Sequence, residues 1–223
     1  MGTVIMHNVV SVDGFIADAQ DEVGPLFDWY ANGDVELIEG GTMKVSRVSA
    51  EYVLPLWAGI GSMVIGRHLF DITDGWAGSP PAGDHVIVVS HRPEPDGWRP
   101  PAARLQPGHP HPRQQCPYYF VDDVAEAVAL ARELAGQRTV AVAAGDVGGQ
   151  AFALGLVDEV AMDVVPVVFG SGKRYFGSAS FGSGGAERLL EDPHTVIQGD
   201  RVLHLRYWVR RLDDLRRQNV SGW

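Results

Sequence analysis

The sequence predicts a single α/β domain built on a buried, mostly parallel sheet with flanking helices. Short runs of β-branched and apolar residues recur along the chain, turn residues bound each run, and segments with helical spacing lie between them. The 223 residues are 45% hydrophobic, and a chain of this length buries about 70% of its unfolded surface. We expect one domain over residues 1–223, with insertions near residues 18–47 and 93–117.

The net charge excludes two classes of partner. The formal charge is −10, whereas surfaces that bind nucleic acid or anionic membranes are basic. The single cysteine, Cys116, cannot form a disulfide framework or a multi-thiolate zinc site. No apolar run reaches the roughly 18 residues of a membrane span, and the start lacks a signal-peptide pattern. We therefore expect a cytoplasmic protein with no nucleic-acid or membrane partner.

The first third of the chain predicts a strand, a loop and a helix. Residues 3–10 form a β-branched run that ends in the turn at residues 11–14. Residues 18–41 contain seven acidic residues and no Lys or Arg, which indicates a long loop. Ser49 is a candidate cap for a helix over residues 50–58, which Pro55 would kink.

The middle of the chain adds two strands and an irregular excursion. Residues 62–65 and 85–89 are short apolar runs, closed by Gly66-Arg67 and by Ser90-His91-Arg92. Residues 93–117 hold eight of the fourteen prolines, so they predict a surface excursion. They do not predict a domain boundary, because the flanking strands need each other.

The last part of the chain predicts a βαβ unit and a hairpin. Asp122 is a candidate cap for a helix that ends at Gly136. A strand over residues 139–144, a helix over 147–154 and a long β-rich run over 157–168 follow. Runs at residues 195–197 and 202–209 flank a turn, which predicts an antiparallel hairpin that closes the sheet.

Three turns at predicted strand ends are candidates for an anionic ligand. Residues 66–69, 90–92 and 144–148 each follow a strand, and ligands of open α/β sheets bind beyond the carboxyl ends of the strands. Each turn taken singly is more often an ordinary connection. Residues 144–149 do not match a classical dinucleotide fingerprint, and residues 170–173 do not match a phosphate-binding loop of the nucleotide triphosphatases.

Asp13 is the candidate catalytic residue. It follows the first strand, where a carboxylate could bind an amine-bearing heterocycle or help to protonate a reducible C=N or C=O group. A structural role as a turn-capping residue before Gly14 is an equal alternative. His109, His111 and Cys116 lie in the proline-rich segment and lack a fourth ligand, so we assign no metal.

Four motifs in order resemble those of a known family. They are residues 11–17 (SVDGFIA), 66–70 (GRHLF), 155–159 (GLVDE) and 166–172 (PVVFGSG). They are similar to motifs in the reductase domain of bifunctional riboflavin-biosynthesis deaminase-reductases and in the stand-alone dihydrofolate-reductase-like proteins grouped with them. The resemblance covers nearly the whole chain apart from the insertions. The deaminase half, with its zinc signature, is absent.

The resemblance implies a dihydrofolate-reductase-like fold, an NADPH site across the carboxyl edge of the sheet and a homodimer. The cofactor-binding residues that it implies are Phe15, Ile16, Ala17, Gly66, Arg67, His68, Leu69, Ser90, His91, Arg92, Ala144, Gly145, Asp146, Val147 and Gly148. The substrate would contact Asp13, Phe27, Asp28 and Trp29, with Trp29 or Phe27 stacking on it from the acidic segment.

Two departures from the family pattern bear on the substrate and the cofactor. Phe15 stands where the pyrimidine reductases carry a basic residue, and the acidic segment 18–41 has no local cation, so we expect a mobile lid that disfavours phosphorylated substrates. Ala143-Ala144 replaces a Gly-Gly pair, which restricts positive φ in the pyrophosphate turn.

The expected function is hydride transfer from NADPH to a small planar heterocyclic or carbonyl substrate, as in the 5-amino-6-(5-phosphoribosylamino)uracil reductase of riboflavin biosynthesis. One alternative is a non-catalytic NADP(H)-binding sensor or assembly protein. Another is dihydrofolate reductase proper, which is disfavoured because its buried helix carboxylate has no clear counterpart here.

Overall fold

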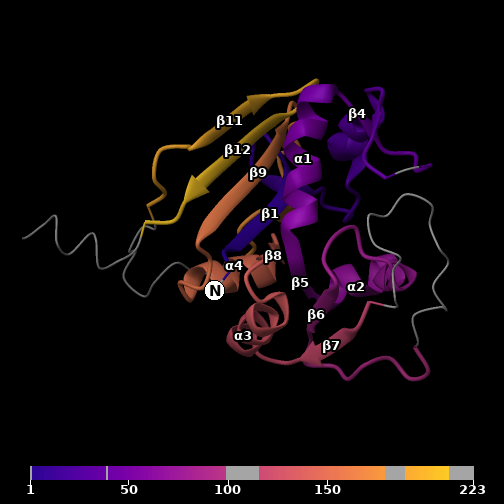
Figure 1. Ribbon diagram of the computed structural model, residues 1–223, viewed down its shortest axis with the longest axis vertical. Helices are drawn as coiled ribbons and strands as arrows, with labels where there is room; N and C mark the ends of the chain where they lie inside the picture. Colours follow the sequence, from indigo (N-terminus) through magenta and orange to yellow (C-terminus); the bar gives the residue numbers. More distant parts are fainter. Residues whose placement is uncertain (1, 39, 99–115, 179–188, 211–223) are drawn as a thin grey trace, which may run out of the picture.

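An eight-stranded sheet forms the centre of the molecule, which is described by a computed structural model for residues 2–38, 40–98, 116–178 and 189–210 (Figure 1). The strand order is β11-β12-β9-β1-β8-β5-β6-β7. The six strands from β9 to β7 are parallel, whereas β12 pairs antiparallel with β9 and with β11. Their bounds are β1 (Val4–Ser11), β5 (Ile60–Gly66), β6 (His85–Val89), β7 (Tyr118–Val121), β8 (Thr139–Ala143), β9 (Glu159–Val165), β11 (Thr195–Gln198) and β12 (Leu203–Trp208).

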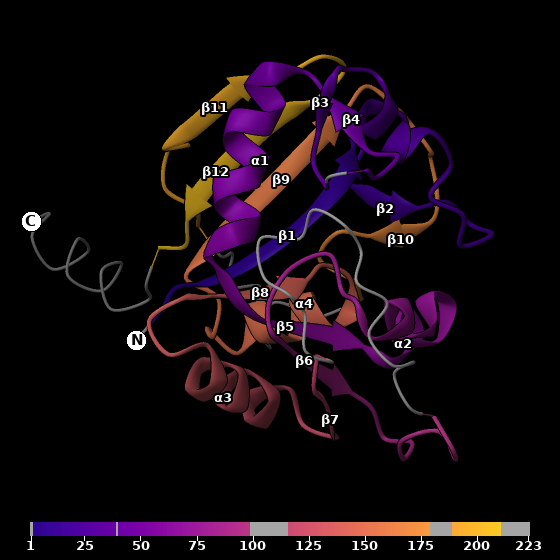
Figure 2. The ribbon, with the colours of Figure 1, turned by 45° about the vertical axis from the view of Figure 1, so that its right-hand side comes forward.

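Helices cover both faces of this sheet (Figures 1 and 2). Successive residues of a strand point to opposite faces, so Val9 and Val10 of β1 identify the two sides. Val9 belongs to the core under one helix, and Val10 belongs to the core under two others. The helices are α1 (Arg47–Gly59) on the Val9 side, α3 (Val124–Ala135) and α4 (Asp146–Ala153) on the Val10 side, and α2 (Arg67–Thr73) with the short turn η2 (Asp74–Gly78) after β5.

The predicted sheet and its order of elements are confirmed. β6 has the predicted bounds, and the C-terminal hairpin pairs as expected. The helix caps lie elsewhere than predicted. Asp123, and not Asp122, accepts the Glu126 backbone N–H of α3 at 2.8 Å. The N-cap of α1 is Ser46, which accepts from the Ser49 N–H, so Ser49 lies inside the helix.

Segment 18–41 is not a long loop. It contains the 3₁₀ helix η1 (Gly24–Ala31) and strand β3 (Val35–Glu36), which pairs with β4 (Lys44–Val45). Leu26 is 0% exposed and Trp29 is 1% exposed, and both pack in the core under α1. The acidic composition of the segment predicted a loop and gave no sign that Leu26 and Trp29 would be buried. Their burial holds the segment against the sheet.

Three other strands were not predicted. β7 emerges directly from the proline-rich segment and pairs with β6. β2 (Phe15–Ala17) and β10 (Lys173–Arg174) form a small antiparallel ladder from segments that are far apart in sequence. Short ladders of this kind carry no local periodicity, because the pairing partner determines them.

A buried polar network links three neighbouring strands to α1. Asp163 of β9 is 1% exposed and contacts His204 of β12 at 2.6 Å and His7 of β1 at 2.9 Å. His204 in turn lies 3.0 Å from the Ser49 hydroxyl on α1. Burial alone would raise the pKa of Asp163, but the charge and hydrogen bonds of His7 and His204 outweigh it and lower that pKa to about 2.

We expect Asp163→Asn to lower the free energy of unfolding by about 3 to 5 kcal/mol, because it leaves the buried His204 and the partly buried His7 without their carboxylate partner. Urea unfolding measures this, with the exposed Asp192→Asn as control. The depressed pKa means that the Asp163 contribution is present above about pH 4 and is lost as the pH falls towards 2. A loss below about 1 kcal/mol would contradict the role assigned to the network.

Candidate functional site

The carboxyl ends of β1, β8, β5 and β6 lie side by side, because these strands are adjacent and parallel. They end at Ser11, Ala143, Gly66 and Val89. The three predicted turns at residues 66–69, 90–92 and 144–148 therefore share one edge of the sheet with the Asp13 loop. This is where an open parallel sheet binds its ligands.

Two glycines allow the elements of this edge to approach closely. Gly145 has φ +96°, and a Cβ there would lie 3.3 Å from Ile16 Cδ1. A Cβ on Gly66 would lie 3.2 Å from Val147 Cγ2. β2, β5 and the start of α4 thus meet around these positions. The sequence suggested that Ala143 and Ala144 restrict positive φ in this turn. Neither residue has a positive φ, so the turn does not need a glycine at these positions.

The start of α4 has no side-chain cap. The amide groups in the first turn of a helix attract anions. The Gly145 N–H itself donates to the Tyr175 carbonyl at 2.7 Å. The Asp146 carboxylate accepts from the Ser178 N–H and hydroxyl at 2.8 Å, and these hydrogen bonds lower its pKa. Asp146 therefore secures the segment after β10, and the remaining amides of the turn are the groups that suit a phosphate.

Two arginines share one carboxylate at the next turns. Arg67 donates its Nε to Asp71 at 2.7 Å, and Arg92 donates its Nη2 to the other oxygen of Asp71 at 2.7 Å. Arg67 also donates to Ser90 Oγ at 3.3 Å and to the Pro93 carbonyl at 2.8 Å. The Arg67 side chain is 15% exposed and that of Arg92 is 65% exposed. Arg67 is thus fixed in place, whereas Arg92 has the freer guanidinium.

Asp13 connects two loops. Its carboxylate accepts from the Ser11 hydroxyl at 2.6 Å, from the Gly170 N–H at 2.7 Å and from the Phe169 N–H at 3.2 Å. The Ser11 hydrogen bond is the main cause of a lowered Asp13 pKa. An ionised carboxylate in this setting accepts hydrogen bonds near neutral pH and does not supply a proton. The structure favours an orienting role over that of a general acid.

The structure buries Trp29, one of the two residues expected to stack on the substrate. Its ring lies 4.0 Å from that of Tyr30 and packs edge-on against His204 in the core under α1. Phe27 is 43% exposed, and Asp28 is also exposed. Among the described residues, no hydrogen bond or ring contact joins Phe27 or Asp28 to Asp13. His91 is exposed beside Arg92, and Leu69 is half-buried in α2.

The acidic segment does have local cations, contrary to the sequence-based expectation. Lys173 Nζ lies 2.5 Å from Asp21 Oδ1, and His68 pairs with the other oxygen of Asp21. Lys44 lies 3.0 Å from Glu36. Lys173, His68 and Lys44 belong to β10, α2 and β4, which lie outside segment 18–41. Their pairing with its carboxylates is therefore seen only in the folded chain. The premise that a phosphate would meet carboxylates alone does not hold.

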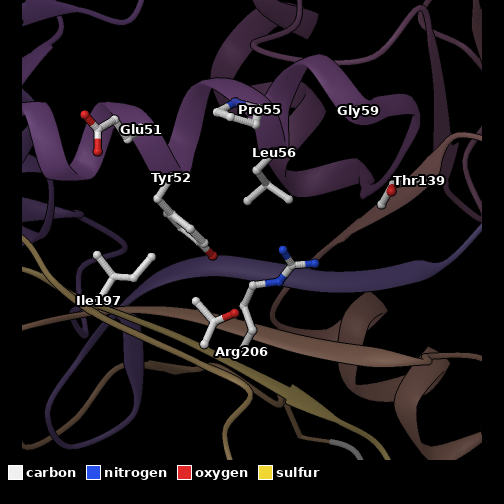
Figure 3. A pocket seen from close by; sticks show the side chains of 9 residues that line it. Glu51, Tyr52, Pro55, Leu56, Gly59, Thr139, Ile197 and Arg206 are labelled. Carbon is white, nitrogen blue, oxygen red and sulfur yellow. The ribbon is translucent and has the colours of Figure 1, made fainter.

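A separate hollow of about 400 Å³ lies between α1 and the β11–β12 hairpin (Figure 3). Tyr52 and Arg206 project into it from α1 and β12. None of the predicted site residues lines it. Arg206 is held by two hydrogen bonds to the buried Glu159, and burial raises the pKa of Tyr52 well above its usual range. The sheet edge, where the predicted site residues lie, therefore remains the candidate site.

The described residues contain no helix long and apolar enough to cross a membrane. No group of His, Cys, Asp and Glu side chains among them has the arrangement of a metal site. His109 and His111 lie outside the described residues, and Cys116 is buried.

Comparisons with known proteins support the fold. No family model and no curated protein matches the sequence. Solved structures do match. A putative riboflavin biosynthesis protein from Shewanella sp. PV-4 aligns over 95% of this chain and 100% of its own, with 16% identity and a TM-score of 0.63. The riboflavin biosynthesis reductase Rib7 of Saccharomyces cerevisiae aligns over 94% and 90%, with 12% identity and a TM-score of 0.53.

A bifunctional deaminase and 5-amino-6-(5-phosphoribosylamino)uracil reductase from Thermotoga maritima aligns over 94% of this chain, with 14% identity and a TM-score of 0.57. The alignment covers 57% of that protein, so this chain spans little more than half its length. At such low sequence identities, the structural match establishes the fold alone. The chain therefore has the dihydrofolate-reductase-like fold of the riboflavin-biosynthesis reductases, as its four motifs predicted.

Proposed function

We propose that this protein is an NADPH-dependent reductase that transfers a hydride to a small planar heterocyclic or carbonyl substrate. The observation that carries the proposal is the meeting of three turns, each a candidate for ligand binding, and the Asp13 loop at one sheet edge. The fold shared with riboflavin-pathway reductases supports an oxidoreductase. The nearest reaction by analogy is the reduction of the ribosylaminopyrimidine named for the Thermotoga protein.

The residues present fit the cofactor. A Cβ at Gly145 would narrow the space beside Ile16, and Gly145 has no side chain that could cap the first turn of α4. These amides suit the pyrophosphate, β2 suits the nicotinamide, and Arg92 suits the 2′-phosphate of the adenosine ribose. The cofactor supplies the hydride when bound. The protein orients two rings and excludes water.

Two further contacts prepare the reacting side of the site. The Arg174 guanidinium lies 5.3 Å from the centre of the Phe15 ring, so it supports the strand that would face the nicotinamide. Asp13, an acceptor of three hydrogen bonds, would orient an amino group of the substrate. We further propose a cytoplasmic homodimer, as the family resemblance implies, and sedimentation of the purified protein tests its dimeric state.

We expect NADPH to bind about tenfold more tightly than NADH, because a charge-assisted contact of Arg92 with the 2′-phosphate contributes about 1.5 kcal/mol. Arg92→Ala should remove most of that preference and leave NADH binding nearly unchanged. Cofactor fluorescence titration measures both affinities, and Arg47→Ala, on the distant helix α1, is the matched control. Equal affinities of the wild type for the two cofactors would exclude the 2′-phosphate contact.

We expect Asp13→Asn to keep NADPH affinity within a few-fold and to lower kcat by roughly 10² to 10⁴. The amide keeps the size of the carboxylate but cannot accept at both oxygens, so the substrate loses its orienting group. Steady-state kinetics measure the effect, with a thermal melt of the same variant. Loss of the fold would show that Asp13 is a structural cap, and unchanged turnover would move the orienting role to another residue.

Turnover across a panel of pyrimidines and pterins separates this proposal from its alternatives. Tight NADPH binding with no turnover on any compound would favour the cofactor-binding sensor. Turnover restricted to dihydrofolate would favour dihydrofolate reductase. Turnover on an aminopyrimidine supports the proposal.

A further inference from the structure

Three ionisable side chains from separate segments meet at one point beside the candidate site. Asp21 lies in the loop after β2, His68 lies on α2, and Lys173 lies on β10. One carboxylate oxygen of Asp21 is 2.5 Å from Lys173 Nζ, and the other pairs with His68 Nε2. Hydrogen bonds from Lys173 and His68, together with their charges, lower the pKa of Asp21 despite its partial burial, which acts to raise it.

The loop that carries Asp21 is a tight, preformed turn. The Asp18 carboxylate accepts from the Gln20 and Glu22 N–H groups at 2.8 and 2.9 Å, and the Asp18 N–H donates to the Glu22 carbonyl at 3.0 Å. Asp21 itself has φ +71°, a conformation that costs energy for a residue other than glycine. The turn therefore presents the Asp21 side chain in a single direction, towards the two cations.

Lys173 and His68 lie on elements next to those that would hold the cofactor. Lys173 pairs with Ala17 of β2, and its charge contributes to the lowered pKa of Asp146 at the start of α4. His68 follows Gly66 and Arg67 directly in α2. Figure 2 shows β2 and β10 together, on the side of the molecule where α2 lies. Lys173 beside β2 and His68 after β5 thus belong to the elements that meet the start of α4 at this edge.

We propose that Lys173 and His68 form a phosphate-binding pair, and that Asp21 is the internal counter-ion that occupies this pair until a phosphate replaces it. The proposal rests on the function proposed above and names a recognition step at the same site. A phosphate carries up to two negative charges and three acceptor oxygens, whereas the Asp21 carboxylate carries one charge and two oxygens. The exchange therefore favours the phosphate at the cations.

The exchange is feasible because the internal pairs are weak. Lys173 and His68 are 44% and 56% exposed, and Asp21 is 30% exposed. Water and salt screen ion pairs at this exposure. The neighbouring carboxylates of Asp18 and Glu22 repel an incoming phosphate, so the loop must move as the phosphate binds. The phosphate comes either from the pyrophosphate of the cofactor or from a phosphorylated substrate.

The test compares Asp21→Asn with Asp34→Asn, a control that neutralises an exposed carboxylate of the same acidic segment. Asn tolerates positive φ well, so the turn should persist. We expect Asp21→Asn to bind NADPH and inorganic pyrophosphate three- to tenfold more tightly than the wild type at low salt, and Asp34→Asn to match the wild type. Lys173→Gln should weaken both ligands by a similar factor. Fluorescence and calorimetric titrations measure these affinities.

Ribose 5-phosphate distinguishes the two sources of phosphate. If Asp21→Asn tightens ribose 5-phosphate binding to the NADPH-loaded protein, the pair serves the substrate. If it tightens only NADPH and pyrophosphate, the pair serves the cofactor. Unchanged pyrophosphate affinity in both Asp21→Asn and Lys173→Gln would overturn the proposal. Failure of every variant to bind NADPH, with pyrophosphate binding that still responds to Asp21→Asn, would refute the proposed function and keep the phosphate pair.

Discussion

A single buried carboxylate constrains the central sheet. Asp163 lies in the middle of β9 with His204 of β12 on one side and His7 of β1 on the other. Because an unpaired buried charge is costly, these strands are stable only in the register that brings both histidines to Asp163. That register places the end of β1 opposite the end of β9, and so brings the Asp13 loop within reach of the Phe169 and Gly170 amides.

The same network explains which parts of the fold the sequence could predict. Strands such as β6 are continuous apolar runs, and α3 has a local apolar stripe with a glycine stop, so composition and spacing identify them. The C-terminal hairpin was also predictable, but the burial of its His204 was not. His204 is 0% exposed. His204 can be buried because it hydrogen-bonds to Asp163. That partner lies 41 residues away in the sequence, so local patterns do not reveal it.

The candidate site shows the same division between local and long-range information. Its turns follow strands and contain glycine, so residues 66–69 and 144–148 could be found from the sequence. The pairing of those turns with carboxylates could not. Arg67 pairs with Asp71 within α2, but Arg92 reaches the same carboxylate only because β5 and β6 are adjacent. Trp29 was expected at the substrate because it lies in an acidic segment, which predicts an exposed loop. It packs in the core under α1 instead.

Both sets of basic side chains at the site are therefore paired with a carboxylate of the chain itself. Asp71 holds the two arginines at one end, and Asp21 holds Lys173 and His68 at the other. On the function proposed here, ligand binding exchanges carboxylates for phosphates and does not fill bare positive pockets. The affinity for a phosphate ligand then reflects the difference between the free energies of the phosphate ion pairs and of the carboxylate ion pairs. That difference is smaller than either free energy. Such a site discriminates ligands by the number of charges that they bring.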